Sequence, residues 1–275
     1  TDTKESQFDM LKSLELNYDD YVDLINHCKE INIDFMSTPY SFEDVDFLVK
    51  LNVDAFKIAS GQLTEIPFLK YVSNTKKPIF LSTGMSNMAE VEEAVNTIFN
   101  ISNKKLIVFQ CTTNYPSKIS DANINVLDSF KSIPNIEIGY SDHVVNNFAC
   151  FAATAKGVYA IEKHFTLDKS LPGPDHSCSL NPKEFEDLVH GVRQIEKALG
   201  SAKKHPTKLE QENIYGMKRS LVYKESILKD TMLTMKHFSF KRPMNGLVPN
   251  NLDHFIGKKL ITDVLKDELV NFNHI

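Results

Sequence analysis

Short apolar runs alternate with amphipathic stretches between residues 30 and 165. The runs are rich in Ile, Val and Phe and occupy residues 33–36, 55–59, 78–81, 106–111, 136–140 and 158–162. Such short, largely apolar runs are typical of strands that are buried on both faces, as in a parallel sheet. Strands that alternate with helices at this spacing indicate an α/β fold, either a barrel or a doubly wound sheet.

Two of the intervening helices are well defined by their sequence. The segment 88–99 places apolar side chains on one helical face, at Met88, Val91, Ala94, Val95 and Ile98. A longer helix begins after Asn181, where the sequence Asn-Pro-Lys-Glu supplies an N-cap, a first-turn proline and an acid at the third position. Its apolar stripe ends at Leu199, and Gly200 fits the C-cap.

Polar residues follow every predicted strand. They are Ser37 and Thr38, Lys57 and Ser60, Ser82 and Thr83, Thr112 and Thr113, Ser141 to His143, and Glu162 to His164. Chemistry contributed by every strand end favours a (β/α)8 TIM barrel over a doubly wound sheet, which gathers its site at one crevice. Six predicted strands are too few to close an eight-stranded barrel, and an open barrel would leave the edges of its sheet exposed. We therefore expect two N-terminal strands to be missing, and the chain alone to be aggregation-prone or inactive until roughly 65–100 further residues are added.

The chain is expected to contain two domains. Residues 1–200 would form the N-terminally incomplete barrel, residues 201–218 a polar linker, and residues 219–275 a small β-rich module. The short β-like runs of that module are residues 220–223, 237–240 and 259–261. Nothing in the sequence indicates an internal repeat.

Composition argues against a nucleic-acid-binding protein, a membrane protein and a disulfide-rich protein. The formal net charge of −5 comes from scattered charges of both signs, which argues against a nucleic-acid partner. No apolar run approaches the roughly 20 residues needed to span a bilayer, so no membrane segment is expected. The four cysteines are far apart and show no CxxC spacing, which favours a reduced cytoplasmic setting over a disulfide framework.

Several strand-end residues are candidates for chemistry. His143 and His164 follow neighbouring runs, and two imidazoles suit Mn, Fe or Zn, although two histidines taken alone are more often structural. Lys57 lies between two apolar residues, which argues against a solvated strand end. It could bind phosphate or carboxylate together with hydroxyl groups from Ser60, Ser82, Thr113 and Ser141. Glu162, two residues before His164, faces the same side of its strand and could hold a ligand or sugar hydroxyls.

Read together, these strand ends resemble the sialic acid synthase family. The matching segments are FMSTPY, FKIASGQ, LSTGM, QCTTNYP, GYSDH, IEKHFTLDKS and PGPDHSCSL, followed by KRPMNG and IGKKL in the small module. The resemblance implies a barrel followed by an antifreeze-like (SAF) β-clip domain, in a domain-swapped homodimer. It also implies condensation of phosphoenolpyruvate with open-chain N-acetylmannosamine to give N-acetylneuraminate and phosphate, a transferase reaction assisted by a divalent metal, usually manganese.

The family's site residues transfer to matching positions. The resemblance implies metal binding by His143 and His164, catalytic roles for Lys57, Glu162, Tyr115 and Arg242, and substrate binding by Thr38, Lys57, Ser60, Gln62, Ser82, Thr113, Tyr115, Ser141, Asp175 and Arg242. Two positions depart from the pattern: Gln62 stands where the family commonly has an acid, and Thr113 where many relatives have Asn. A turn role for Asp175 and a solvated Arg242 are the plainer alternatives.

Three other functions are compatible with the residues. A sister synthase of the legionaminic acid type would use the same motifs. A Schiff-base aldolase would use Lys57 as its nucleophile, with no need for metal. A catalytically dead, sugar-binding paralogue would account for Gln62 and for the missing strands.

Overall fold

The computed structural model describes residues 6–101 and 105–275. The chain divides into two compact units, Thr1–Gly200 and Ser201–Ile275. Each unit has its own hydrophobic core. Among the described residues no helix is long and apolar enough to span a membrane.

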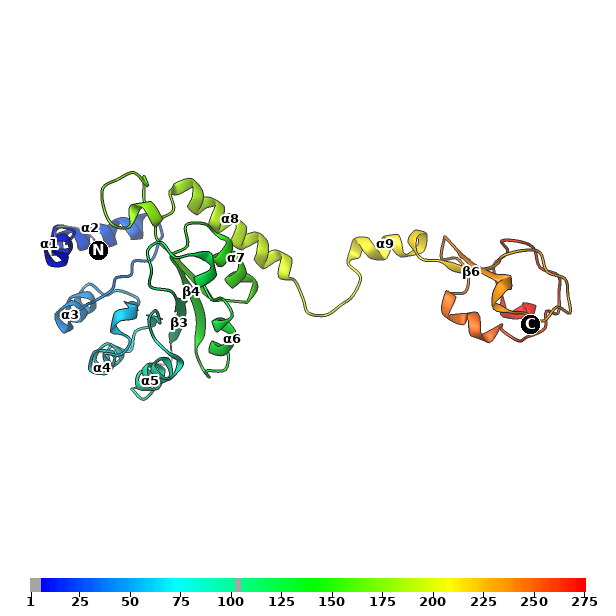
Figure 1. Ribbon diagram of the computed structural model, residues 1–275, viewed down its shortest axis with the longest axis horizontal. Helices are drawn as coiled ribbons and strands as arrows, with labels where there is room; N and C mark the ends of the chain where they lie inside the picture. The colour runs from blue at the N-terminus through cyan, green and yellow to red at the C-terminus, as the bar shows by residue number, and fades with distance from the viewer. Residues whose placement is uncertain (1–5, 102–104) are drawn as a thin grey trace. The chain divides into compact units, whose positions relative to one another are not determined.

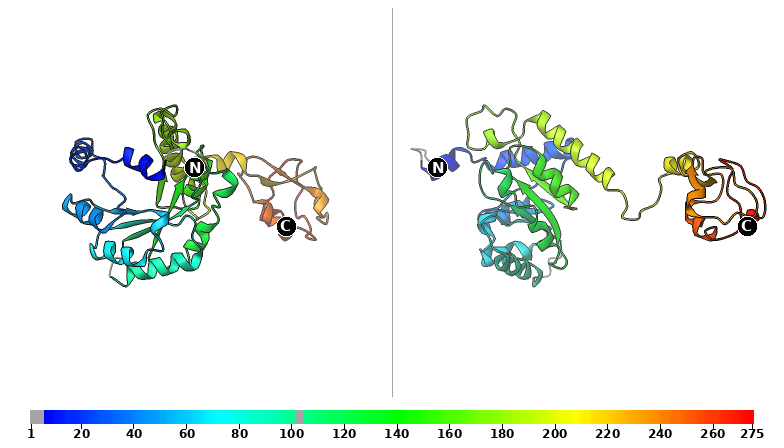
Figure 2. Two further views of the ribbon diagram at one scale, coloured as in Figure 1. Left: turned by 60° about the vertical axis from the view of Figure 1, so that its left-hand side comes forward. Right: turned by 45° about the vertical axis from the view of Figure 1, so that its right-hand side comes forward.

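The first unit is built on one parallel sheet. Its strands are β1 (Phe56–Ile58), β2 (Ile79–Ser82), β3 (Leu106–Cys111), β4 (Glu137–Asp142) and β5 (Ala160–Lys163), paired in chain order. A doubly wound sheet reverses its strand order part-way, and this sheet does not. The sheet curves in one direction with helices along its outer side, as an open half-barrel (Figures 1 and 2). The prediction of a parallel α/β fold is therefore confirmed at the level of a half-barrel.

The run at residues 33–36 was wrongly predicted as a strand. Within the described part of the chain this segment meets the sheet only at the next residue, Ser37, through a parallel bridge to Phe56. The run lies beside β1, the first strand of the sheet, and no described strand lies on its other side. It therefore cannot be hydrogen-bonded on both sides, and most of its side chains are exposed. At the opposite edge, every residue of β5 is only half-buried.

Eight α-helices are described in the first unit. They are α1 (Gln7–Ser13), α2 (Tyr18–Glu30), α3 (Phe42–Lys50), α4 (Ile66–Asn74), α5 (Met88–Phe99), α6 (Val126–Phe130), α7 (Phe148–Ala155) and α8 (Pro182–Leu199). The predicted helices at 88–99 and 182–199 are confirmed. Asn181 accepts the Glu184 N–H at 2.9 Å, and Gly200 ends α8 with a φ of 53°, as the capping pattern predicted.

The two faces of the sheet have different residues. Most side chains that face the helices are apolar and buried, for example Ile58, Leu81 and Val108. The alternating positions on the opposite, concave face include Lys57 and Ser82. The core thus holds the strands in place while polar groups project from the concave face.

The second unit begins with a helix inside the expected linker. Helix α9 (Lys208–Met217) starts at a Thr207–Glu210 capping box, so the polar segment is only partly irregular. Strands β6 (Ser220–Tyr223) and β7 (Phe238–Lys241) pair antiparallel. Residues 259–261 form no strand and contribute one bridge, from Lys259 to Met232. Short 3-10 turns complete the unit at Met235–His237, Pro249–His254 and Phe272–His274.

Candidate functional site

Lys57 is the centre of a polar network on the concave face. Its side chain is only 11% exposed, and its Nζ donates to Ser82 Oγ at 2.7 Å. The same Nζ lies 3.4 Å from Glu162 Oε2, and Glu162 Oε1 accepts the Ser141 hydroxyl at 2.7 Å. Four strands therefore contribute to one chain of contacts, because β1, β2, β4 and β5 place these residues on the same side.

A second set of polar groups meets at the loops after β1, β2 and β3. Ser60, in the 3-10 turn Ser60–Gln62, accepts the Gly84 N–H at 2.9 Å. A Cβ added at Gly84 would lie 2.0 Å from Thr113 Oγ1 and 2.8 Å from Ser60 Oγ, so the three residues are in close approach. Thr113 Oγ1 is buried without a hydrogen-bond partner among the described residues. Gly84 was not predicted as a site residue, although a glycine directly after a Ser-Thr strand end was a usable signal.

His143 and His164 lie together at the ends of β4 and β5, with ring centroids 5.1 Å apart. His143 Nδ1 lies 2.7 Å from the Thr112 carbonyl oxygen, which can only accept, so this nitrogen carries a proton and Nε2 is the atom of the ring that can bind a metal. His164 Nδ1 lies 3.6 Å from Asp175 Oδ2. Outer partners of this kind are usual for histidines that bind a metal through the other nitrogen.

The environment favours neutral imidazole and a protonated phenol. Burial, followed by the neighbouring His143, lowers the pKa of His164. The Tyr115 ring lies 4.2 Å from that of His143 and 5.6 Å from that of His164. Burial, followed by the nearby Cys111, raises the pKa of Tyr115 to about 12, so its hydroxyl remains a donor at neutral pH. The donor set fits a borderline divalent cation held by two imidazoles.

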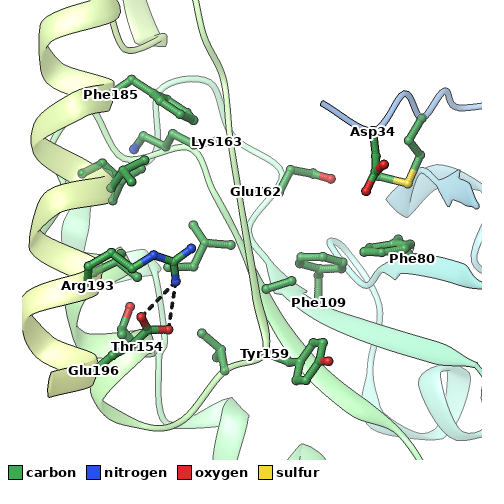
Figure 3. A pocket seen from close by; sticks show the side chains of 17 residues that line it. Asp34, Phe80, Phe109, Thr154, Tyr159, Glu162, Lys163, Phe185, Arg193 and Glu196 are labelled. Carbon is green, nitrogen blue, oxygen red and sulfur yellow. Dashed lines mark hydrogen bonds and ion pairs between the residues drawn. The ribbon is translucent and has the colours of Figure 1, made fainter. Parts of the chain in front are cut away.

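A buried ion pair lies next to the two histidines, on the opposite face of the sheet. Asp142 and Lys163 face each other across β4 and β5, with Asp142 Oδ2 2.6 Å from Lys163 Nζ. Figure 3 shows Glu162 and Lys163 pointing to opposite sides of β5. Lys163 also donates to the carbonyl oxygens of Val144 and Asn146 in the loop after His143. Sequence reasoning missed this pair, although two charged residues at helix-facing strand positions were a signal.

The remaining predicted residues are placed less directly. Gln62 is only 4% exposed, and neither its Oε1 nor its Nε2 has a hydrogen-bond partner among the described residues. Thr38 is half-buried beside the Ser37 bridge. Arg242 lies in the second unit, where its Nε donates to the Met217 carbonyl oxygen at 2.9 Å. The predicted residues that the structure brings together thus come from the first unit.

A cavity of about 710 Å³ adjoins Glu162. Phe80 and Phe109 line it from neighbouring strands, and Asp34 and residues of α8 line other parts of its wall (Figure 3). The Lys57 ammonium lies 5.9 Å from the Phe109 ring centroid, which joins the polar network to this apolar wall. Of the polar network, Glu162 is the residue that lines this cavity, and the cavity is large enough for a small molecule.

The fold and the site define a half-barrel α/β protein with polar residues at the carboxyl ends of its strands. Residues 1–204 match the NeuB family, and the chain belongs to this family. It is 40% identical to the N,N'-diacetyllegionaminic acid synthase of Campylobacter jejuni, over 98% of this chain and 81% of that protein. It is 34% identical to the N-acetylneuraminate-9-phosphate synthase of Homo sapiens, over 94% of this chain and 72% of that protein.

A solved structure gives the same result. The N-acetylneuraminic acid (sialic acid) synthetase of Leptospira borgpetersenii, in complex with citrate, superposes with a TM-score of 0.71. It is 32% identical, and the match covers 75% of this chain and 72% of that one. The resemblance seen in the strand-end motifs is confirmed.

Proposed function

We propose that the protein condenses phosphoenolpyruvate with the open-chain aldehyde of an N-acetylated amino sugar to give a nonulosonic acid and phosphate. The observation that carries this proposal is the Lys57–Glu162 contact, which puts a cation, a carboxylate and two hydroxyl groups on one concave face. The naming of the relatives as nonulosonic acid synthases supports it.

The lysine network suits the anionic substrate. Lys57 is largely withdrawn from solvent, so its attraction for a phosphate or carboxylate is screened less than at the surface. The Ser82 hydroxyl already accepts a hydrogen bond from this ammonium. The Thr113 hydroxyl has no hydrogen-bond partner among the described residues, so it could bind substrate without breaking an existing hydrogen bond. We assign phosphoenolpyruvate to these residues together with Ser60.

The imidazole pair suits the sugar aldehyde. His143 and His164 would hold a divalent cation, most suitably Mn²⁺, through their Nε2 atoms. When bound, such an ion supplies Lewis-acid polarisation of a carbonyl oxygen. Tyr115 offers a phenolic O–H beside both rings, where it can donate to a substrate oxygen.

The reaction needs three proton movements. The C3 atom of phosphoenolpyruvate bonds to the aldehyde carbon, and the aldehyde oxygen takes up a proton. A water oxygen then bonds to C2 and loses one proton. The bond from C2 to the phosphate oxygen breaks, the second proton of that water passes to the leaving phosphate, and C2 becomes a ketone carbon. Glu162 is assigned the proton that this water loses, because its carboxylate lies between Lys57 and Ser141 at the edge of the cavity.

The identity of the sugar is a choice between two acetamido sugars. N-acetylmannosamine would give N-acetylneuraminate, and a sugar with two acetamido groups would give a legionaminic acid. The 40% identity to the N,N'-diacetyllegionaminic acid synthase of Campylobacter jejuni supports the second candidate. Arg242 is proposed to contact the sugar from the small unit of a neighbouring subunit in a domain-swapped homodimer. Mixing His143→Ala with Arg242→Ala protein under subunit exchange should then restore activity that neither variant has.

The deciding assay measures phosphate and nonulosonic acid formed from phosphoenolpyruvate with both sugars, with and without chelator. Lys57→Met should raise the KM for phosphoenolpyruvate more than that for the sugar, whereas Lys183→Met on the exposed face of α8 should change neither. A Schiff-base aldolase would instead keep its activity in chelator and trap substrate on Lys57 when borohydride is added. Absence of turnover with either sugar would refute the proposed reaction.

A further inference from the structure

Three side chains with different metal-binding atoms lie together beside the histidine pair. His164, Asp175 and Cys178 place a nitrogen, a carboxylate oxygen and a sulfur all within 4.8 Å of one another. His164 Nδ1 and Asp175 Oδ2 are 3.6 Å apart. Ligand atoms around a tetrahedral zinc ion are separated by about 3.3–3.8 Å, given Zn–N and Zn–O distances near 2.0 Å and Zn–S distances near 2.3 Å. The trio is therefore close to the spacing that zinc needs.

The local structure allows the three ligand atoms to move closer together, to the distances of a zinc site. Cys178 closes the 3-10 turn His176–Cys178, and its sulfur is directed back to the Asp175 carbonyl oxygen at 3.1 Å. The Asp175 side chain is 52% exposed and makes its only described side-chain contact with His164. A carboxylate on an exposed loop can rotate toward the sulfur without disturbing the core. Cys178 is buried, so its sulfur is held in place on one side of the site.

The donor types select among metals. A thiolate is a soft ligand that suits zinc and disfavours manganese, and nitrogen, oxygen and sulfur sites bind Zn²⁺ more tightly than Mn²⁺. This site would also hold its ion with three protein ligands, whereas the proposed catalytic cation has two imidazole ligands. A cation that occupied the trio would use His164 Nδ1, the atom that otherwise faces Asp175.

We propose that His164, Asp175 and Cys178 form a zinc-binding site that shares His164 with the catalytic site. A neutral imidazole has one lone pair, so zinc bound at His164 Nδ1 would leave the ring proton on Nε2, the atom assigned to the catalytic metal, and the ion would inhibit the enzyme. The binding stands on the geometry alone, whereas the inhibition rests on the proposed function.

The test uses metal-free protein, with Co²⁺ as an optical probe and Zn²⁺ as its competitor. The expected result is a sulfur-to-cobalt charge-transfer band in the near ultraviolet that saturates at one equivalent and is abolished by Zn²⁺. Cys178→Ser should remove the band and weaken Zn²⁺ binding by at least about tenfold. Cys28→Ser, which changes a free cysteine in α2, is the matched control and should keep both.

Each outcome decides the proposal. A wild-type protein that binds Co²⁺ without the band, or that binds neither ion, overturns the site even if Cys178→Ser fails to fold. In turnover assays with Mn²⁺, added Zn²⁺ should inhibit the wild type and the Cys28→Ser variant far more than Cys178→Ser. Equal inhibition of all three would overturn the regulatory part. Absence of any turnover would refute the proposed function, and the optical titration would still decide the zinc site.

Discussion

Asp142 and Lys163 form a buried ion pair, and each residue directly precedes one of the two site histidines. Their side chains are 0% and 1% exposed, and they occupy the same rung of the β4–β5 ladder. Asp142 Oδ1 also accepts the Tyr140 hydroxyl at 2.9 Å and the Val144 N–H at 3.0 Å. A slip of one residue between strands would turn their side chains to opposite faces, so this pair fixes the register that brings His143 and His164 together.

Breaking this pair should destabilise the protein strongly. Asp142→Asn or Lys163→Met leaves one buried charge without its partner, which costs about 3–5 kcal/mol of unfolding free energy. The double variant should lose less than the sum of the two, because the residues are in direct contact. Urea unfolding monitored by circular dichroism measures all three values.

Lys183→Met is the control for this experiment. Lys183 pairs with Glu186 and Asp187 on the surface of α8, at 3.1 and 2.9 Å, and should show no measurable change in the same unfolding experiment. Additive losses in the double variant would mean that Asp142 and Lys163 contribute independently.

Gly84 should tolerate no side chain. Gly84→Ala places a methyl group 2.0 Å from Thr113 Oγ1 and 2.8 Å from Ser60 Oγ, so both hydroxyl groups must move. We expect a loss of about 1–3 kcal/mol in stability, together with a raised KM for phosphoenolpyruvate. Gly61→Ala is the matched control, because no atom of the described residues lies within 4 Å of its added Cβ and it is adjacent to Ser60. Similar kinetics for the two variants would remove Gly84 from the substrate site.

Local patterns sufficed to predict the five strands and two of the eight described helices of the first unit. The strand at Leu106–Cys111 and the helix at Met88–Phe99 have the predicted bounds, because a buried run and an amphipathic face are local properties of sequence. The prediction of a strand at 33–36 was wrong for a non-local reason. Strand formation depends on hydrogen-bonded partner strands, and among the described residues this segment has only the bridge from the adjacent Ser37. Helix α9 was missed because its capping box lies in a polar stretch with a weak apolar stripe.

The site could be predicted only in part for the same reason. Strand alternation placed Glu162 and His164 on one side, and the structure puts Glu162 beside Lys57. His143 Nδ1 donates to the backbone carbonyl oxygen of Thr112. Every residue has such an oxygen, so the amino-acid type at position 112 does not predict this contact. The Asp142–Lys163 pair depends on the register of two strands that are separated by a helix. Such contacts follow from tertiary structure, which a motif does not describe.

Metal affinity should depend on pH through His164. Burial and the neighbouring His143 lower its pKa, so the neutral ring that binds metal persists to lower pH than for a free histidine. We expect the His164 ring to titrate below about 6.5 in metal-free protein and Mn²⁺ affinity to fall through that range. NMR of the ring nitrogens and calorimetric titration with Mn²⁺ measure the two quantities. A His164 pKa above 6.5 would contradict the expected effect of burial.

Gln62 should show a conflict between stability and function. Both of its amide atoms are buried without a described partner, and such a group costs about 1–3 kcal/mol. Gln62→Leu removes that cost, so the unliganded protein should become more stable, while the KM for a substrate should rise if the amide serves to bind it. Gln194→Leu, on the exposed side of α8, is the control and should leave the KM unchanged. Gln62→Glu installs the acid common in the family, and unchanged kinetics would show that the carboxylate is dispensable here. If Gln62→Leu is destabilising and the KM stays constant, the amide has a structural partner and does not bind substrate.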